Sequence, residues 1–115
     1  MSSQVHMLSQ VHMSSQVHEL HIKYPDHVFV IIQTTSAAIT IHKRKFITAY
    51  DVSFGQFMQS IRKNEHVILS RDQSIVGFIG NIVPPPTMSM GRLYSRYKGN
   101  DYILYITIET ESVFG

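Results

Sequence analysis

The stretch KRKFITAYDVSFGQFMQSIRK, residues 43–63, decides the fold because it holds the clearest helix signal in the chain. Ser53 and Gln56 have the spacing of a capping box, in which each side chain bonds a backbone N–H that the first helical turn leaves unsatisfied. Apolar side chains then recur at i, i+3, i+4 and i+7, which places Phe54, Phe57, Met58 and Ile61 on one face. The pattern predicts an amphipathic helix over residues 53–63 whose apolar face packs in the core.

The segment VFVIIQTT, residues 28–35, reads as a strand with two apolar faces. One face carries Val28, Val30 and Ile32, and the other carries Phe29 and Ile31. Such a strand is either covered on both faces, or covered on one and open to a partner on the other. The alternating segment AAITIHKRK, residues 37–45, predicts a second strand, joined to the first as a hairpin through a turn at Thr35–Ser36.

Three further elements follow the helix. A polar loop over residues 64–73 leads to a short strand through Ile79, which a turn at Gly80–Asn81 ends. After the prolines at 84–86, Thr87 can cap a second helix, and Gly99 fits the left-handed position that ends it. The apolar face of this helix is predicted to hold Met90, Leu93, Tyr94 and Tyr97. YILYITIE, residues 102–109, predicts the last strand.

The N-terminus is a repeat tract. Residues 2–19 are three copies of a hexapeptide, SSQVHM, LSQVHM and SSQVHE. We predict that residues 1–14 are flexible, that a short helix spans 15–23 ahead of Pro25, and that residues 15–115 form one domain ending in a tail. Histidines recur at positions 6, 12 and 18, but a flexible repeat supplies ligand types without convergent geometry, so no metal site is predicted.

Composition narrows the function classes. A chain of 115 residues with 43% hydrophobic residues is sufficient for one core. It has no cysteine, and no secretory signal or membrane-length apolar run is recognisable, so we expect a cytoplasmic protein. A net charge of +2 gives no reason to expect nucleic acid as a partner. No Ser-His-Asp or paired-carboxylate constellation stands out, so neither an enzyme nor a cofactor is predicted.

The order of hairpin, helix, strand, short helix and strand indicates an α+β fold. It is the order of the β-grasp, or ubiquitin-like, fold. We expect a four-stranded mixed sheet with helices packed on one face, a short N-terminal helical extension, and the last strand parallel to the first in the sheet centre.

Several linked motifs resemble those of one family at collinear spacing. They are KRK followed by an aromatic residue at 43–46, DVSFGQF at 51–57, IRK at 61–63, PPPT at 84–87, and the terminal Phe-Gly. From about Tyr24 to Gly115 the chain resembles the autophagy ubiquitin-like modifiers of the GABARAP and microtubule-associated light-chain-three type.

The resemblance implies conjugation through the C-terminus. Activating and conjugating enzymes would join Gly115 to phosphatidylethanolamine on autophagosomal membranes, with Phe114 as the recognition residue beside it, and a deconjugating cysteine protease would reverse the attachment. A residue without a side chain on a flexible tail can enter a narrow enzyme channel. The alternative is an adaptor that binds linear motifs without being conjugated.

The resemblance also implies a groove for linear motifs of cargo receptors and autophagy factors, which carry an aromatic and an aliphatic anchor. The peptide would add as a strand along residues 45–48. The aromatic pocket falls on Leu20, Phe29, Ile31, Lys45, Ile47 and Ile103. The aliphatic pocket falls on Phe46, Thr48, Val52, Phe57 and Ile61, of which the last two are equally well explained by core packing.

The sequence departs from the family pattern at several positions. Residues 1–19 contain no lysine or arginine, unlike the basic N-terminal helix that the resemblance implies. Gln16 stands at an acidic position and His27 at an arginine position. Phe29, Ile103 and Ala49 replace a proline, an aromatic residue and a proline, which reshapes both pockets.

Overall fold

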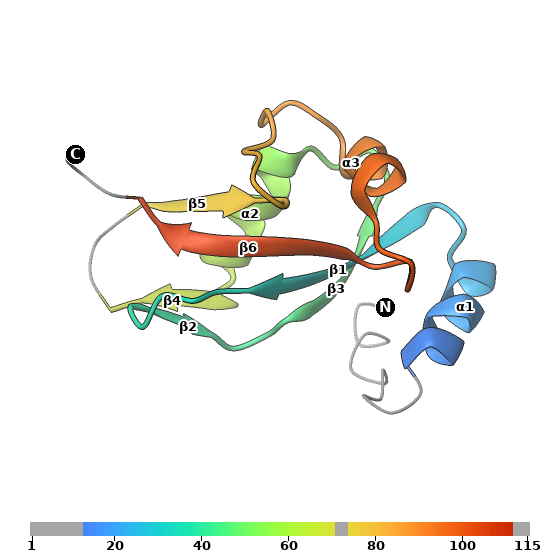
Figure 1. Ribbon diagram of the computed structural model, residues 1–115, viewed down its shortest axis with the longest axis horizontal. Coiled ribbons are helices and arrows are strands. Elements are labelled where there is room, and N and C mark those ends of the chain that lie inside the picture. The colour runs from blue at the N-terminus through green and yellow to red at the C-terminus, as the bar shows by residue number, and fades with distance from the viewer. Residues whose placement is uncertain (1–12, 71–73, 112–115) are drawn as a thin grey trace.

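The computed structural model describes residues 13–70 and 74–111. Its helices and strands follow one another along the chain (Figure 1) as α1 (Met13–Lys23), β1 (His27–Gln33), β2 (Ile39–Ile41), β3 (Lys45–Ala49), α2 (Phe54–Lys63), β4 (Val67–Leu69), β5 (Ile75–Phe78), α3 (Met90–Tyr97) and β6 (Leu104–Thr110).

The main sheet has four strands in the order β3-β1-β6-β5. β1 and β6 lie parallel in its centre, with Val30 opposite Leu104 and Ile32 opposite Ile106. β3 and β5 are antiparallel to their neighbours and form the two edges. The predicted β-grasp fold and the parallel pairing of the first and last strands are therefore confirmed.

The capping box at the start of α2 is confirmed. The Ser53 hydroxyl oxygen accepts from the Gln56 backbone N–H at 3.1 Å, and the Ser53 backbone N–H donates to Gln56 Oε1 at 2.9 Å. Phe54, Phe57 and Ile61 are buried, as the periodicity predicted.

We expect Ser53→Ala to destabilise the domain by about 1 kcal/mol, because the N–H of Gln56 loses its acceptor. Chemical denaturation would measure this loss of unfolding free energy, and the m-value should stay unchanged. Ser70→Ala, at an exposed serine outside any cap, is the matched control. An equal loss in both variants would contradict the role of the cap.

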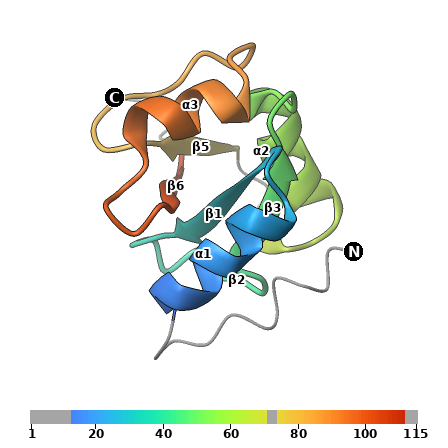
Figure 2. The same ribbon diagram turned by 90° about the vertical axis from the view of Figure 1, so that its right-hand side faces the viewer.

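The sheet separates two apolar clusters. The main core holds Val30, Ile106 and their neighbours on one sheet face with buried side chains of α2 and α3. A smaller cluster on the opposite face holds Val17, Phe29 and Ile103. In Figure 2, α1 and α3 lie on opposite sides of β1 and β6. The expectation that all helices pack on one face was wrong, because Phe29 and Ile103 point away from the main core and need α1 to bury them.

The predicted hairpin was wrong in its second strand. β1 pairs with β3, and the segment 39–41 pairs instead with β4, inside what was expected to be a polar loop. Both His42 and Lys43 donate backbone N–H groups to the His66 carbonyl, at 2.8 and 3.4 Å. This crossing diverts β2 from β1, and the short ladder packs Ile39 and Val67 against the main core.

The ends of α3 also differ from expectation. Ser89, and not Thr87, is the N-cap, with its hydroxyl accepting from the Arg92 N–H at 3.1 Å. The chain before it is held extended beside the start of α2, because Met90 N–H donates to the Val52 carbonyl at 2.7 Å. Gly99 is not left-handed. Lys98 leaves the helix in an extended conformation, and the positive φ of 64° falls on Tyr102.

Candidate functional site

β3 is an edge strand of the main sheet, and its side chains alternate between the two sheet faces. Its ladder with β1 sets Ile47 opposite Phe29, Phe46 opposite Val30, and Lys45 opposite Ile31. Ile47 and Lys45 therefore share a face with Phe29, and Phe46 lies on the face of the main core. An edge strand with apolar groups on both faces can accept an added peptide strand.

Five of the six residues predicted for the aromatic pocket meet on one face of the sheet. Leu20, Ile31 and Ile47 are partly buried against Phe29 and Ile103. Lys45 is the sixth, and it lies beside them in the ladder opposite Ile31. Phe29 and Ile103 are only 2% and 1% exposed. Val17 of α1 is fully buried among these residues, so this helix covers the floor of the predicted pocket.

Four of the five residues predicted for the aliphatic pocket line one pocket of about 320 Å³ beside β3. These are Phe46, Thr48, Phe57 and Ile61, joined by Ile47. Phe57 and Ile61 also belong to the main core, with 4% and 0% exposure, so the core-packing explanation is confirmed, and their part in motif binding stays a prediction. Val52 packs against the main core and is not among the residues lining this pocket.

Five of the residues at these two pockets were not assigned to them from the sequence, although Lys43 belongs to the basic run 43–45 beside the strand edge. The aliphatic pocket is completed by polar side chains, Lys43, Ser60, Asn64 and His66. Ser60 and Asn64 follow Phe57 at i+3 and i+7, so helical spacing could have found them. His66 reaches this pocket through the pairing of β4 with β2, which no local sequence pattern predicted. Val17 was assigned to the helix but not to the pocket.

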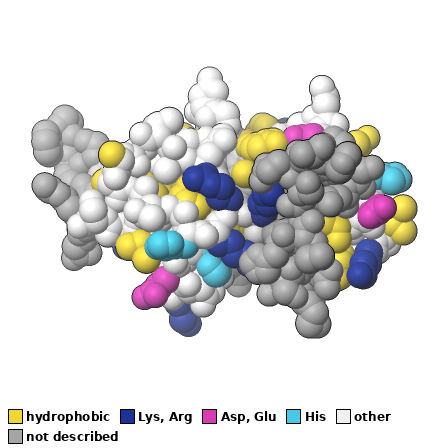
Figure 3. Space-filling model, turned by 90° about the horizontal axis from the view of Figure 1, so that it is seen from below, with side chains coloured by type: hydrophobic (Ala, Val, Ile, Leu, Met, Phe, Trp, Pro, Cys, Tyr) yellow, Lys and Arg dark blue, Asp and Glu magenta, His cyan; other side chains and the backbone are white. Residues whose placement is uncertain are grey.

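The rim of the aliphatic pocket is basic. Lys43 Nζ lies 5.1 Å from the centroid of the Phe46 ring, and the His66 ring lies 5.4 Å from the same ring. Burial, together with the nearby Lys43 charge, lowers the pKa of His66. Lys and Arg side chains gather in the middle of the face that Figure 3 presents, with His side chains close by. The positive charge of Lys43 is suited to an acidic partner group at this rim.

Two further expectations concern regions that the structure does not cover. Phe114 and Gly115 lie outside the described residues, as do His6 and His12. Within residues 13–70 and 74–111, no group of three or more His, Asp or Glu side chains could hold a metal ion. Of the helices described, none has the length and apolar character needed to cross a membrane.

Comparison with known proteins gives one consistent result. Residues 12–115 match the family described as autophagy protein Atg8, ubiquitin-like. The crystal structure of Trypanosoma brucei ATG8 is similar, with 26% sequence identity, a TM-score of 0.73, and coverage of 89% of this chain and 88% of that one. Plasmodium falciparum Atg8 in complex with an Atg3 peptide from the same organism is 27% identical, with a TM-score of 0.74 and coverage of 97% and 98%.

Proposed function

This chain belongs to the Atg8 family of ubiquitin-like autophagy proteins, and from that premise we propose that it is a modifier conjugated through Gly115 to phosphatidylethanolamine. We assign it to the GABARAP and light-chain-three type, acting as a tether and not as an enzyme. It is cytoplasmic and attaches reversibly to autophagosomal membranes. Its partners are activating and conjugating enzymes, a deconjugating cysteine protease, and cargo receptors with linear motifs.

The tail supports this proposal by its chemistry. β6 ends at Thr110, so Gly115 follows the sheet by five residues, a reach of about 17 Å when extended. That length would let the Gly115 carboxyl group enter an enzyme channel while the folded domain stays outside. Glycine at the end presents no side chain to the channel walls.

The edge position of β3 is the observation that carries the motif-binding proposal. A peptide strand added to β3 alternates its side chains between the two sheet faces. The cluster beneath α1 and the aliphatic pocket lie on opposite faces, so two anchor residues must be separated by an odd number of positions. An aromatic and an aliphatic residue three positions apart meet this condition.

The Plasmodium structure holds an Atg3 peptide, and we propose that this chain likewise takes a peptide of its Atg3-type conjugating enzyme. The same edge strand would serve both this enzyme and the cargo receptors, so the two would compete. The positive charge of Lys43 at the rim favours acidic segments in each case.

We expect Ile47→Gln to lower the affinity for a fluorescent peptide by about tenfold or more. The peptide is acidic and carries an aromatic and an aliphatic anchor three residues apart. Ile47 borders both the smaller cluster around Phe29 and Ile103 and the aliphatic pocket, so a polar side chain there removes apolar contact with the peptide. Fluorescence polarisation measures the affinity.

Ile68→Gln is the matched control, since Ile68 is 41% exposed on β4 and borders neither pocket. Equal affinity for both variants would place the peptide elsewhere. If the chain binds the motif peptide normally but is not conjugated by the enzymes, the second candidate function, an unconjugated adaptor, is supported. The lack of basic residues over positions 1–19 favours that candidate.

A further inference from the structure

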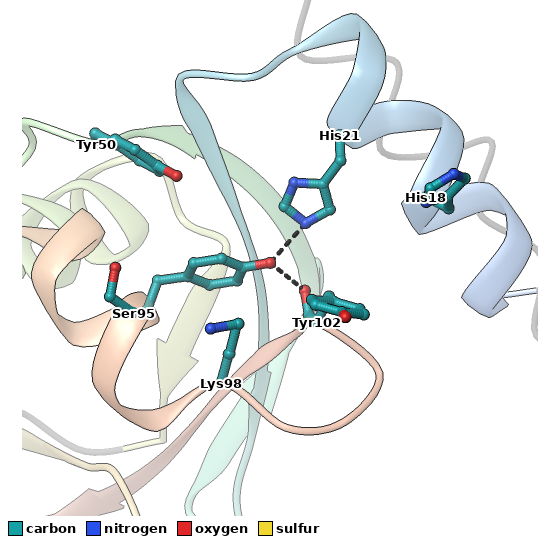
Figure 4. Close-up of a pocket in the computed structure, with 7 residues that line it drawn as sticks. His18, His21, Tyr50, Ser95, Lys98 and Tyr102 are labelled. Atoms are coloured by element: carbon teal, nitrogen blue, oxygen red, sulfur yellow. Dashed lines mark hydrogen bonds between the residues drawn. The ribbon is translucent and has the colours of Figure 1, made fainter.

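A second hollow lies between α1, α3 and the loop before β6, and its His21 ring packs edge-on against the Phe29 ring at a centroid distance of 4.5 Å. It has a volume of about 420 Å³ and is lined by His18, His21, Tyr50, Tyr94, Ser95, Lys98 and Tyr102 (Figure 4). None of these residues belongs to either predicted pocket. The lining contains three groups that can carry positive charge, four hydroxyl groups and no carboxylate.

Hydrogen bonds fix the proton arrangement at the floor of this hollow. The Tyr94 hydroxyl donates to the Tyr102 carbonyl at 2.7 Å, because a carbonyl oxygen can only accept. The same hydroxyl oxygen lies 2.6 Å from His21 Nε2 and must therefore accept from it. Neutral His21 consequently carries its proton on Nε2, and its Nδ1 is the atom left to gain a proton. In Figure 4 the Tyr50 hydroxyl lies across the open space from His21.

The positive groups around the hollow repel one another. Burial lowers the pKa of His21, the Tyr102 carbonyl acts in the opposite direction, and His18 and Lys98 lower it further by charge repulsion. Lys98 Nζ lies 5.5 Å from the centroid of the Tyr94 ring. An anion in the hollow would reverse this repulsion and favour the charged form of His21.

The carboxylate close to the hollow does not neutralise it. Asp101 accepts from the Ile103 backbone N–H at 3.1 Å with one oxygen and from the Tyr105 hydroxyl at 2.6 Å with the other. Desolvation and this bond to Asp101 raise the pKa of Tyr105 to about 12, so the hydroxyl stays a donor. Both carboxylate oxygens of Asp101 thus hold the loop, and Asp101 does not pair with His18, His21 or Lys98 in these bonds.

We propose that this hollow binds a phosphate monoester carried on a partner protein, a phosphorylated side chain. A phosphate monoester offers three acceptor oxygens and a charge of about −1.5 to −2, which matches His18, His21 and Lys98 with hydroxyl donors between them. The volume falls within the range of about 300–1,000 Å³ typical of ligand pockets.

The position of the hollow decides between a protein and a lipid headgroup as the source of the phosphate. Figure 1 shows α1 and α3 near one end of the long axis and the C-terminal end of β6 at the other. A membrane attached through the tail would lie at the far end from the hollow. This choice of source rests on the proposed conjugation, whereas phosphate binding itself does not.

The test uses the full chain and four probes, observed by NMR of the histidine rings. The probes are a short phosphoserine peptide without hydrophobic anchors, its unphosphorylated twin, inorganic phosphate at the same concentration, and vesicles containing a phosphoinositide. We expect only the phosphopeptide to shift the His18 and His21 resonances. It should raise the pKa of His21, which burial and the neighbouring positive charges otherwise lower, and its affinity should increase as the pH falls through the pKa of His21 in the complex.

Lys98→Gln and His18→Gln should each lower the affinity for the phosphopeptide by about tenfold, the loss expected for one charge-assisted hydrogen bond. Lys63→Gln removes a positive charge from an exposed position on α2 and should leave the affinity unchanged. Both lining variants keep the Tyr94 bonds, so backbone spectra should report an intact fold.

Four results would overturn the proposal. They are unmoved His21 resonances, equal weakening by Lys63→Gln, a response to vesicles alone, and a response to inorganic phosphate without one to the phosphopeptide, which would mean an adventitious ion only. Because neither conjugation enzymes nor a motif peptide takes part, failure here leaves the proposed modifier function unaffected.

Discussion

We expect Gly115→Ala to abolish conjugation to phosphatidylethanolamine in a reaction reconstituted from the purified chain, cognate activating and conjugating enzymes, ATP and liposomes. This is the expected result because a methyl group at the reacting residue obstructs the narrow channel in which the carboxylate is adenylated and transferred. The parent chain should give a membrane-bound product of altered gel mobility, and the variant should give none.

The control is Glu111→Ala, which changes the same tail without touching the reacting residue. Glu111 is exposed, and its backbone N–H donates to the Ser74 carbonyl at 2.9 Å, a bond that alanine preserves. Glu111→Ala should be conjugated at the parent rate. Product from Gly115→Ala in equal yield would remove Gly115 from its proposed role. If the parent also fails while the enzymes act on another family member, the unconjugated adaptor becomes the better reading.

The elements that the sequence predicted well are those whose signals are local. The capping box at Ser53 and Gln56, the apolar face of α2 and the two apolar faces of β1 depend on spacing within a few residues. All three were confirmed. The pairing of β1 with β6 was predicted from element order and the resemblance, and the structure bears it out.

The misses arose where partners distant in sequence decide the conformation. Residues 39–41 alternate like the second strand of a hairpin, yet their partner is β4, a segment too short to carry its own signal. The start of α3 shifted to Ser89 because the bridge between Ser53 and Ser89 holds the preceding chain extended. No window of local sequence contains either contact.

The candidate site divides in the same way. The shared face of Phe29 and Ile31 follows from strand alternation, and Ile103 was placed beside them through the predicted pairing. The burial of Val17 over this face did not follow, because it depends on where α1 docks. His66 likewise reaches the aliphatic pocket only through tertiary pairing.

We expect Ile106→Ala to cost about 3 kcal/mol of unfolding free energy, within the range of about 2–5 kcal/mol for truncating a buried isoleucine. Ile106 is fully buried on a central strand, opposite Ile32 and between two neighbouring strands, so the cavity cannot collapse easily. In a domain whose total stability is about 5–15 kcal/mol, this is a large fraction. Chemical denaturation followed by circular dichroism measures it.

Ile22→Ala is the matched control because Ile22 is 72% exposed, and its change should stay within about 0.5 kcal/mol. Equal losses in the two variants would contradict the assigned core.

Ile103→Ala separates the two faces of the sheet. Ile103 is as buried as Ile106, but α1 covers it in a cluster whose other buried members, among the described residues, are Val17 and Phe29. We therefore expect a smaller global loss together with faster amide exchange in α1, because the cavity can be relieved by movement of one helix. That difference matters for function. In the motif-binding function that we propose, this face must yield to an incoming aromatic anchor while the sheet that presents it stays folded, and a helix held by few buried contacts would meet both requirements.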